Sequence, residues 1–319
     1  MNNQTVLVTG GTGFVGIHTI LQLLQQGYTV KTTLRTLSKT PTIIDALKEA
    51  GLADFSTLSF FEADLTSDTG WDEAVKDCDY VLHVASPFPL AEPEDENELI
   101  IPARDGSLRV LKATRQAGVK RVVLTSSFAA IGYGADRKGH TFDENDWTDK
   151  NANIPAYIKS KTVAEEAAWD FIKDEGEGME LTVINPVGIF GPIIGGIYPA
   201  SFEGVIQAIL DGTIKESPDF TFGVVDVRDV ADIHIKAMRL PQAAGQRFLA
   251  TSEGTVSFYD VAELIKKQRP ESAALVADLQ PPASEGYLKI SNKKAVETLN
   301  WHPRSKEEAI LASVDTRPK

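Results

Sequence analysis

TVLVTGGTGFVG, residues 5–16, is the stretch that decides the fold. Its first residues are aliphatic or β-branched and predict a buried strand, whereas the apolar positions that follow recur at helical spacing. The glycines between them allow a tight turn, let backbone approach a pyrophosphate, and pack helix against strand. The N–H groups that open such a helix attract phosphate. A plain structural turn is the alternative. We expect a phosphate-binding turn formed by Gly10, Thr12, Gly13, Phe14, Val15 and Gly16.

Strands and helices alternate along the first half of the chain. Apolar runs predict strands at 28–34, 58–61, 80–84, 121–125 and 181–185, and helical spacing predicts helices at 97–117 and 157–173. Such alternation indicates a parallel sheet covered by helices on both faces. The expected fold class is therefore α/β, a doubly wound parallel sheet (Rossmann) with a smaller C-terminal substrate-binding lobe. Residues 1–186 would form the dinucleotide-binding core, 219–250 would return to it, and 187–218 and 251–319 would form the lobe.

Composition restricts the partners and the compartment. The net charge of -13 argues against nucleic acid or an anionic membrane as a partner, because both require a basic surface. No apolar run is long enough for a membrane span, and the single cysteine, Cys78, fits a reducing compartment. The histidines are scattered without ligand spacing, so we expect no metal site. We expect a cytoplasmic protein.

The charges after the second predicted strand indicate which dinucleotide is bound. Folds that prefer NAD place an acidic residue about 20 residues beyond the turn, where it binds the ribose 2′-hydroxyl. Here no acidic residue precedes Asp45, and the second strand is followed by Arg35 and Lys39. A guanidinium can pair with the 2′-phosphate of NADP. The sequence favours NADP(H), with a pair of solvated loop charges as the alternative.

A tyrosine, a lysine and a serine form the candidate catalytic set. Lys161 follows Tyr157 by four residues in a predicted helix, so both side chains share one face. An ammonium near a phenol lowers the pKa of the phenol, which improves proton transfer to a carbonyl oxygen. Ser127, just after the strand at 121–125, would donate a hydrogen bond to that oxygen, although the residues alone do not exclude Ser126. The alternative is a helix-surface pair and two strand-end serines.

These residues resemble the extended short-chain dehydrogenase/reductases, and more closely the branch of dihydroflavonol, cinnamoyl-CoA and methylglyoxal or ketone reductases. The resemblance is carried by six segments in order: 8–16, 83–88, 121–127, 157–161, 185–187 and 226–231. Plant cinnamoyl-CoA reductases have an Asn-Trp-Tyr-Cys-Tyr-type signature around the tyrosine, where this chain has Ile154-Pro155-Ala156-Tyr157. A general ketone or aldehyde reductase is therefore expected in place of a thioester reductase.

The resemblance also implies roles for individual residues. It implies Ser127, in place of Ser126, as the third catalytic residue, and a contact between Lys161 and the nicotinamide ribose. The other implied cofactor contacts are Asp64 and Leu65 at the adenine, Ala85 and Ser86 at the middle of the cofactor, and Pro186 and Val187 at the nicotinamide. For Asp64 alone, a helix N-cap before Trp71 is an equal alternative.

Apolar residues in the loops at the carboxyl ends of the strands are the substrate candidates. They are Phe88, Phe128, Ile154, Val187, Tyr198 and Phe202, which suggests a small-molecule carbonyl substrate without a strongly charged group. The acidic stretch at 143–146 predicts a solvated loop, with a mobile lid as the alternative.

Two other functions stay open beside an NADPH-dependent carbonyl reductase. An NAD-dependent nucleotide-sugar epimerase or dehydratase would use the same fold, and so would a non-catalytic dinucleotide sensor. The former does not fit Arg35 and Lys39 well, and the latter tends to lose the tyrosine or the lysine. We expect a monomer or a homodimer.

Overall fold

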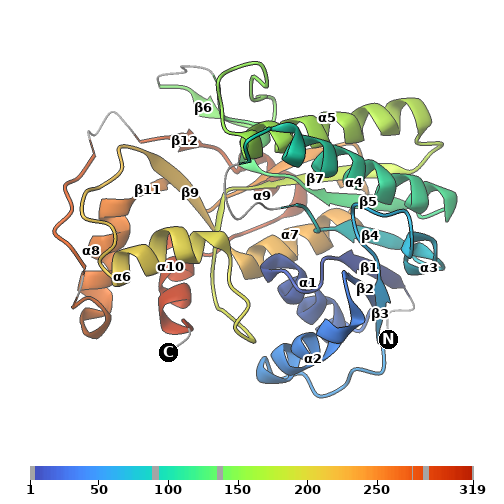
Figure 1. Cartoon of the computed structure of the whole chain (residues 1–319), viewed down its shortest axis with the longest axis horizontal. Helices are drawn as coiled ribbons and strands as arrows, with labels where there is room; N and C mark the ends of the chain where they lie inside the picture. Colours follow the sequence, from blue (N-terminus) through green and yellow to red (C-terminus); the bar gives the residue numbers. More distant parts are fainter. Residues whose placement is uncertain (1–3, 88–92, 135–138, 275, 283–286, 318–319) are drawn as a thin grey trace.

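The computed structural model describes residues 4–87, 93–134, 139–274, 276–282 and 287–317. Its centre is a seven-stranded parallel sheet in the order β10-β7-β5-β4-β1-β2-β3 (Figure 1). The strands are β1 (Thr5–Thr9), β2 (Thr29–Leu34), β3 (Leu58–Glu62), β4 (Tyr80–His83), β5 (Arg121–Thr125), β7 (Glu180–Pro186) and β10 (Arg247–Ala250). The predicted doubly wound sheet is confirmed.

Helices cover both faces because the buried residues of each strand alternate. Val6 and Val8 of β1 join one apolar cluster with α1 (Phe14–Gln25), α2 (Thr40–Glu49) and α7 (Val227–Arg239). Leu7 joins a second cluster with α3 (Trp71–Val75), α4 (Asn97–Gln116) and α5 (Ala156–Glu175). The catalytic candidates on α5 therefore lie on the second face.

A smaller lobe lies beside the carboxyl ends of these strands (Figure 1). Its three-stranded sheet has the order β11-β9-β8 and comprises β8 (Gly188–Phe190), β9 (Thr221–Asp226) and β11 (Thr255–Ser257). A third apolar cluster holds it against η3 (Phe202–Gln207), α6 (Ala208–Leu210), α8 (Phe258–Gln268) and α10 (Lys306–Asp315). A separate pair, β6 (Thr141–Phe142) and β12 (Lys289–Ile290), joins the two parts of the chain.

Segments after residue 218 divide between core and lobe differently from the sequence prediction. In the segment 219–250, α7 and β10 pack in the core, but β9 pairs with the lobe strands. In the segment 251–319, α9 (Lys293–Leu299) and Trp301 pack in the first core cluster. Trp301 is fully buried, and its indole Nε1 donates to the carbonyl of Asp229 at 3.0 Å. Hydrophobic periodicity identifies these elements but does not indicate which sheet or cluster they join.

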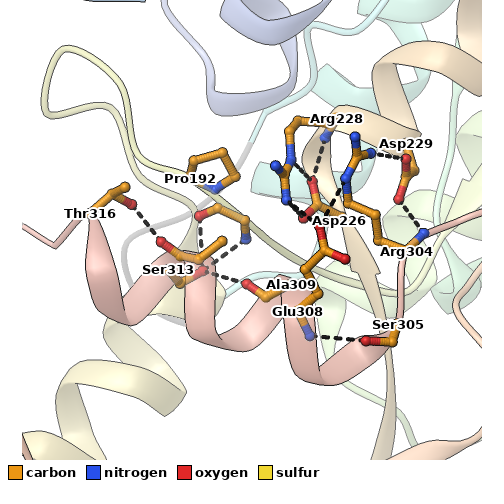
Figure 2. A network of polar contacts seen from close by, with 12 residues as sticks. Pro192, Asp226, Arg228, Asp229, Arg304, Ser305, Glu308, Ala309, Ser313 and Thr316 are labelled. Carbon is orange, nitrogen blue, oxygen red and sulfur yellow. Dashed lines mark hydrogen bonds and ion pairs between the residues drawn. The ribbon is translucent and has the colours of Figure 1, made fainter. Parts of the chain in front are cut away.

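Charged side chains connect the beginning of α7 to α10. Asp226 caps α7 and accepts hydrogen bonds from the Arg228 guanidinium at 2.9 and 2.6 Å, while Arg304 pairs with Asp229. Figure 2 shows both arginines beside Glu308, which accepts from Arg304 at 3.1 Å and from Arg228 at 3.4 Å. We call these five residues the seam network. It fastens the lobe to the core.

No helix among the described residues has both the length and the apolarity needed to cross a bilayer. Within the same part of the chain, no group of three or more histidine, cysteine or acidic residues is arranged to hold a metal ion.

Candidate active site

The glycine turn closes against the loop that follows β4. Gly10 has a φ of +76°, and a Cβ added to it would lie 3.0 Å from the Cα of Ala85. A Cβ at Gly16 would lie 2.3 Å from the carbonyl oxygen of Gly10. Both positions therefore need glycine, the first for its backbone conformation and the second for close packing. Gly13 N–H donates to the Gly10 carbonyl at 2.9 Å and completes the turn.

The amino end of α1 is available to an anion. Gly13 is its N-cap, and no described side chain caps the first N–H groups. Thr12 and Gly13 are exposed, whereas Phe14 and Val15 direct their side chains into apolar clusters. Any contact of Phe14 or Val15 with a phosphate would use the backbone. Uncapped N–H donors and a close-packed glycine turn fit a dinucleotide pyrophosphate.

The hydroxyl of Thr9 fixes the loop that faces this turn. It accepts hydrogen bonds from the N–H groups of Val84 and Ala85 at 3.1 and 3.0 Å, so its own proton points to Nδ1 of His83 at 2.8 Å. His83 is fully buried, and burial lowers its pKa to about 3, so it stays neutral. The loop that carries Ala85 and Ser86 is thereby held at the end of β4.

The serine, tyrosine and lysine come together at the carboxyl ends of β4 and β5. Ser127 caps the short helix η2 (Phe128–Ala130), and its side chain is hydrogen-bonded to that of Tyr157. Lys161, one turn after Tyr157, lies with its Nζ 5.5 Å from the centre of the phenol ring and donates to the Ser86 hydroxyl at 2.8 Å. The three residues selected from the sequence thus lie together in one cluster.

The electrostatics of this cluster differ from the expectation. Burial raises the pKa of Tyr157, and the hydrogen bond from Ser127 opposes that rise. Burial also lowers the pKa of Lys161 to about 8. The pKa of Tyr157 therefore moves in the direction opposite to the expected lowering, because desolvation is the largest cause of its shift and the Lys161 ammonium is directed to Ser86.

The two adjacent serines have different partners. Ser126 is buried and donates to the Glu165 carboxylate at 2.6 Å, on the interior side of the strand end. Ser127 is less buried and contacts Tyr157. The geometry therefore favours Ser127 for contact with a substrate.

The candidates for the adenosine end lie beyond β2 and β3. Arg35 and Lys39 are exposed, and Lys39 ends the short helix η1 (Leu37–Lys39). Asp64 accepts from the N–H and the hydroxyl of Thr66, both at 2.7 Å, and these bonds, with a smaller contribution from Arg35, lower its pKa. The N-cap of α3 is Gly70, so the N-cap alternative for Asp64 is wrong. Leu65 packs against the backbone of α4 at Gly106.

The substrate candidates are distributed over several environments. Phe128 is buried in a cluster with Phe142, and Phe202 is buried in the lobe cluster. Tyr198 is 41% exposed with its ring 5.4 Å from that of Phe202. Ile154 and Val187 are half-buried, Pro186 is buried at the end of β7, and Phe88 lies outside the described residues.

Sequence reasoning missed Tyr133, which is close enough to Tyr157 to raise its pKa and stands 42% exposed. Its ring packs on Phe128 at 5.8 Å. A tyrosine six residues after Ser127 gave no motif signal, because the turn that brings it back is set by contacts with Thr148.

The parallel sheet, the uncapped glycine turn and the serine–tyrosine–lysine cluster define a dinucleotide-binding protein equipped for proton transfer. A family model described as "NAD dependent epimerase/dehydratase family" matches residues 6–249. The chain therefore belongs to this family, as one of the extended short-chain dehydrogenase/reductases that its motifs resemble.

Individual relatives cover nearly the whole chain. The putative NADPH-dependent methylglyoxal reductase GRP2 of Candida albicans is 32% identical over 322 residues, 94% of either chain. The structure of yeast methylglyoxal/isovaleraldehyde reductase Gre2 complexed with NADPH has a TM-score of 0.87 at 27% identity, over 98% of both chains. That of Gre2 in complex with NADPH from Candida albicans has a TM-score of 0.85 at 30% identity, again over 98% of both.

Proposed function

We propose that the protein is an NADPH-dependent carbonyl reductase that converts a ketone or aldehyde to an alcohol. The observation that supports this most is the hydrogen bond between Ser127 and Tyr157 beside the buried ammonium of Lys161, at the sheet edge where the glycine turn lies. The relatives named above as NADPH-dependent or solved with NADPH are reductases of small carbonyl compounds by name.

NADPH, when bound, supplies the hydride for the carbonyl carbon. Tyr157 donates its proton to the carbonyl oxygen, and Ser127 stabilises the negative charge that develops there through a hydrogen bond. Lys161 holds a positive charge next to the phenol, which favours loss of the phenolic proton. The loop bearing Ala85 and Ser86, together with Pro186 and Val187, would hold the nicotinamide beside Tyr157 and Ser127.

Arg35 is proposed to select NADPH over NADH. It is exposed directly after β2, at the position where folds that prefer NAD carry an acidic residue. Lys39 would add positive charge nearby, and Asp64 would keep the arginine oriented. The Arg35→Ala variant should lose affinity for NADPH by roughly tenfold or more while affinity for NADH changes little.

The substrate is proposed to be a mid-sized, largely apolar carbonyl compound bound between the core and the lobe, with Ile154, Tyr198 and Tyr133 as the accessible candidates. The lobe would comprise 187–218 and those parts of 251–319 that pack with it. A cytoplasmic location and a monomeric or homodimeric state complete the proposal, which size-exclusion chromatography with light scattering and cell fractionation would test.

The decisive assay follows the absorbance of the reduced nicotinamide with a panel of ketones, aldehydes and diketones. Wild-type protein should consume NADPH faster than NADH, and Tyr157→Phe should lower kcat by about 10²–10⁴-fold while NADPH still binds. Native turnover in Tyr157→Phe would contradict the mechanism. Binding of NADPH without turnover in the wild type would favour an epimerase or a sensor.

A further inference from the structure

Glu165 lies on the same face of α5 as the two catalytic candidates. Tyr157, Lys161 and Glu165 are spaced four residues apart, so successive side chains stack along one side of the helix. The side chain of Glu165 is fully buried. A buried carboxylate requires hydrogen bonds and a countercharge, so its partners show what it holds in place.

One oxygen of this carboxylate is directed toward the strand end that carries Ser127. Its Oε2 accepts from the Ser126 hydroxyl at 2.6 Å and from Asn185 Nδ2 at 2.7 Å. The same Nδ2 donates to the carbonyl oxygen of Ser127 at 3.2 Å. Ser127 is therefore linked to Glu165 in two ways: through the side chain of the preceding residue, Ser126, and through Asn185, which binds the Ser127 carbonyl.

The other oxygen is directed away from the candidate catalytic cluster. Oε1 accepts from Arg247 Nε at 2.5 Å and from Trp169 Nε1 at 3.3 Å. Arg247 neutralises the carboxylate and also donates to the carbonyls of Glu144 and Asp146, both at 2.9 Å. This half of the network anchors the carboxylate to β10 and to the loop at 143–147.

We infer that Glu165 is a positioning residue that sets the place of the Ser127 hydroxyl relative to Tyr157, acting through Ser126 and Asn185. This inference rests on the proposed function, because Ser127 is assigned there to the carbonyl oxygen. Asn185, which donates to Glu165, directly precedes Pro186. The same carboxylate therefore also orders the end of β7 that is proposed to face the nicotinamide.

The chain offers a matched pair of variants for the test. Ser126→Ala removes a donor to Oε2, on the side of Ser127, and Trp169→Phe removes a donor to Oε1, on the opposite side. Both leave the Glu165–Arg247 pair intact. We expect Ser126→Ala to lower kcat by about tenfold with the KM for NADPH within about twofold, because displacement of a positioning group affects the chemical step. Trp169→Phe should keep kcat within about twofold.

A second readout does not depend on turnover. In protein labelled with ¹³C at the tyrosine ζ carbon, the Tyr157 signal, assigned by its loss in Tyr157→Phe, reports the hydrogen bond from Ser127. It should shift in Ser126→Ala and stay in place in Trp169→Phe at neutral pH, with thermal unfolding confirming that both variants are folded.

The outcomes separate the two proposals. A wild type that reduces no carbonyl would contradict the proposed function, while the tyrosine signal would still test the positioning. Equal effects of the two variants on kcat and on the tyrosine signal, or no effect of either, would overturn the role of Glu165 whatever the reaction is.

Discussion

Two buried cations are found at α5, Lys161 on the helix itself and Arg247 on β10 beside it, and their surroundings differ. The Arg247 guanidinium contacts the fully buried carboxylate of Glu165, so the two charges cancel inside the protein. The ammonium of Lys161, one turn earlier on the helix, donates to the neutral hydroxyl of Ser86, and burial lowers its pKa to about 8. The Arg247–Glu165 pair holds β10 and α5 together. Lys161, by contrast, has a pKa close to neutral pH, so it can exchange a proton there.

The difference shows where the protein accepts an electrostatic cost. Desolvation penalises every buried charge, and an opposite charge or several hydrogen bonds must offset it. Around Arg247 the Glu165 carboxylate provides that offset, whereas among the described residues Lys161 contacts the neutral Ser86 hydroxyl and the ring of Tyr157. Strongly shifted groups gather at functional sites for this reason. The seam network supplies a third environment, in which the side chains of Arg228 and Arg304 are 31% and 37% exposed to water while those of their partners Asp226 and Asp229 are 0% and 8% exposed.

Removing the Glu165 carboxylate from Arg247 should change the free energy of unfolding more than any other proposed variant. Glu165→Ala leaves the Arg247 charge buried without its partner, which should lower the free energy of unfolding by about 3–5 kcal/mol. Urea unfolding followed by circular dichroism measures it. The matched control is the double variant Glu165→Leu/Arg247→Met, which removes both charges and should be clearly more stable than Glu165→Ala. A double variant as unstable as the single one would show that packing, and not charge, is decisive there.

Removing the charge of Lys161 should instead raise the free energy of unfolding. The pKa of Lys161 is about 8 in the folded protein and about 10.5 in the unfolded chain. Between these pH values the unfolded chain binds more protons than the folded protein. The free energy of unfolding of the wild type therefore rises with pH through this window. Below pH 8 the buried charge is a cost. Lys161→Met should therefore raise the free energy of unfolding at pH 7 by something on the order of 2 kcal/mol.

This gain should shrink toward pH 10.5, and urea unfolding at a series of pH values would measure it. Lys161→Arg is the control, because arginine stays charged throughout and should show no such pH dependence. A gain that is the same at every pH would contradict the assignment of the effect to ionisation.

The smallest effect is expected in the seam network. The Glu308 side chain is 54% exposed and contacts Arg228 and Arg304, which both have a second carboxylate partner. Glu308→Gln should lower the free energy of unfolding by less than about 1 kcal/mol. The difference from wild type should vanish in about 1 M salt, where charges are screened within about 3 Å. A loss as large as that of Glu165→Ala would erase the distinction between the two kinds of ion pair.

The sequence predicted the part of the molecule that local pattern determines. The glycine turn, the first six strands of the parallel sheet and the spacing of Tyr157 and Lys161 depend on residues close together in the chain, and the structure contains them. The family assignment from these motifs is likewise confirmed.

Burial of charge could not be predicted in the same way. Glu165 and Glu166 are adjacent and identical, yet the first is fully buried and the second pairs with Lys150 with a third of its side chain exposed. Glu144 belongs to the acidic stretch expected to be solvated, but it is 7% exposed and accepts from the N–H of Leu249 at 2.8 Å. Each carboxylate has a partner on β10, Arg247 for Glu165 and Leu249 for Glu144, and these lie 82 and 105 residues further along the chain. No local pattern relates residues so far apart.

Trp301 has a consequence for the order in which the molecule can be completed during synthesis. The first core cluster begins with β1 and α1, yet it is closed by an indole that the ribosome adds after the entire parallel sheet has been made. Until then, the cluster to which Val6, Ile17 and Ile233 belong lacks one of its largest fully buried side chains. The nascent chain must therefore carry an incomplete apolar surface through most of its translation, and this is the interval in which a chaperone would have something to bind.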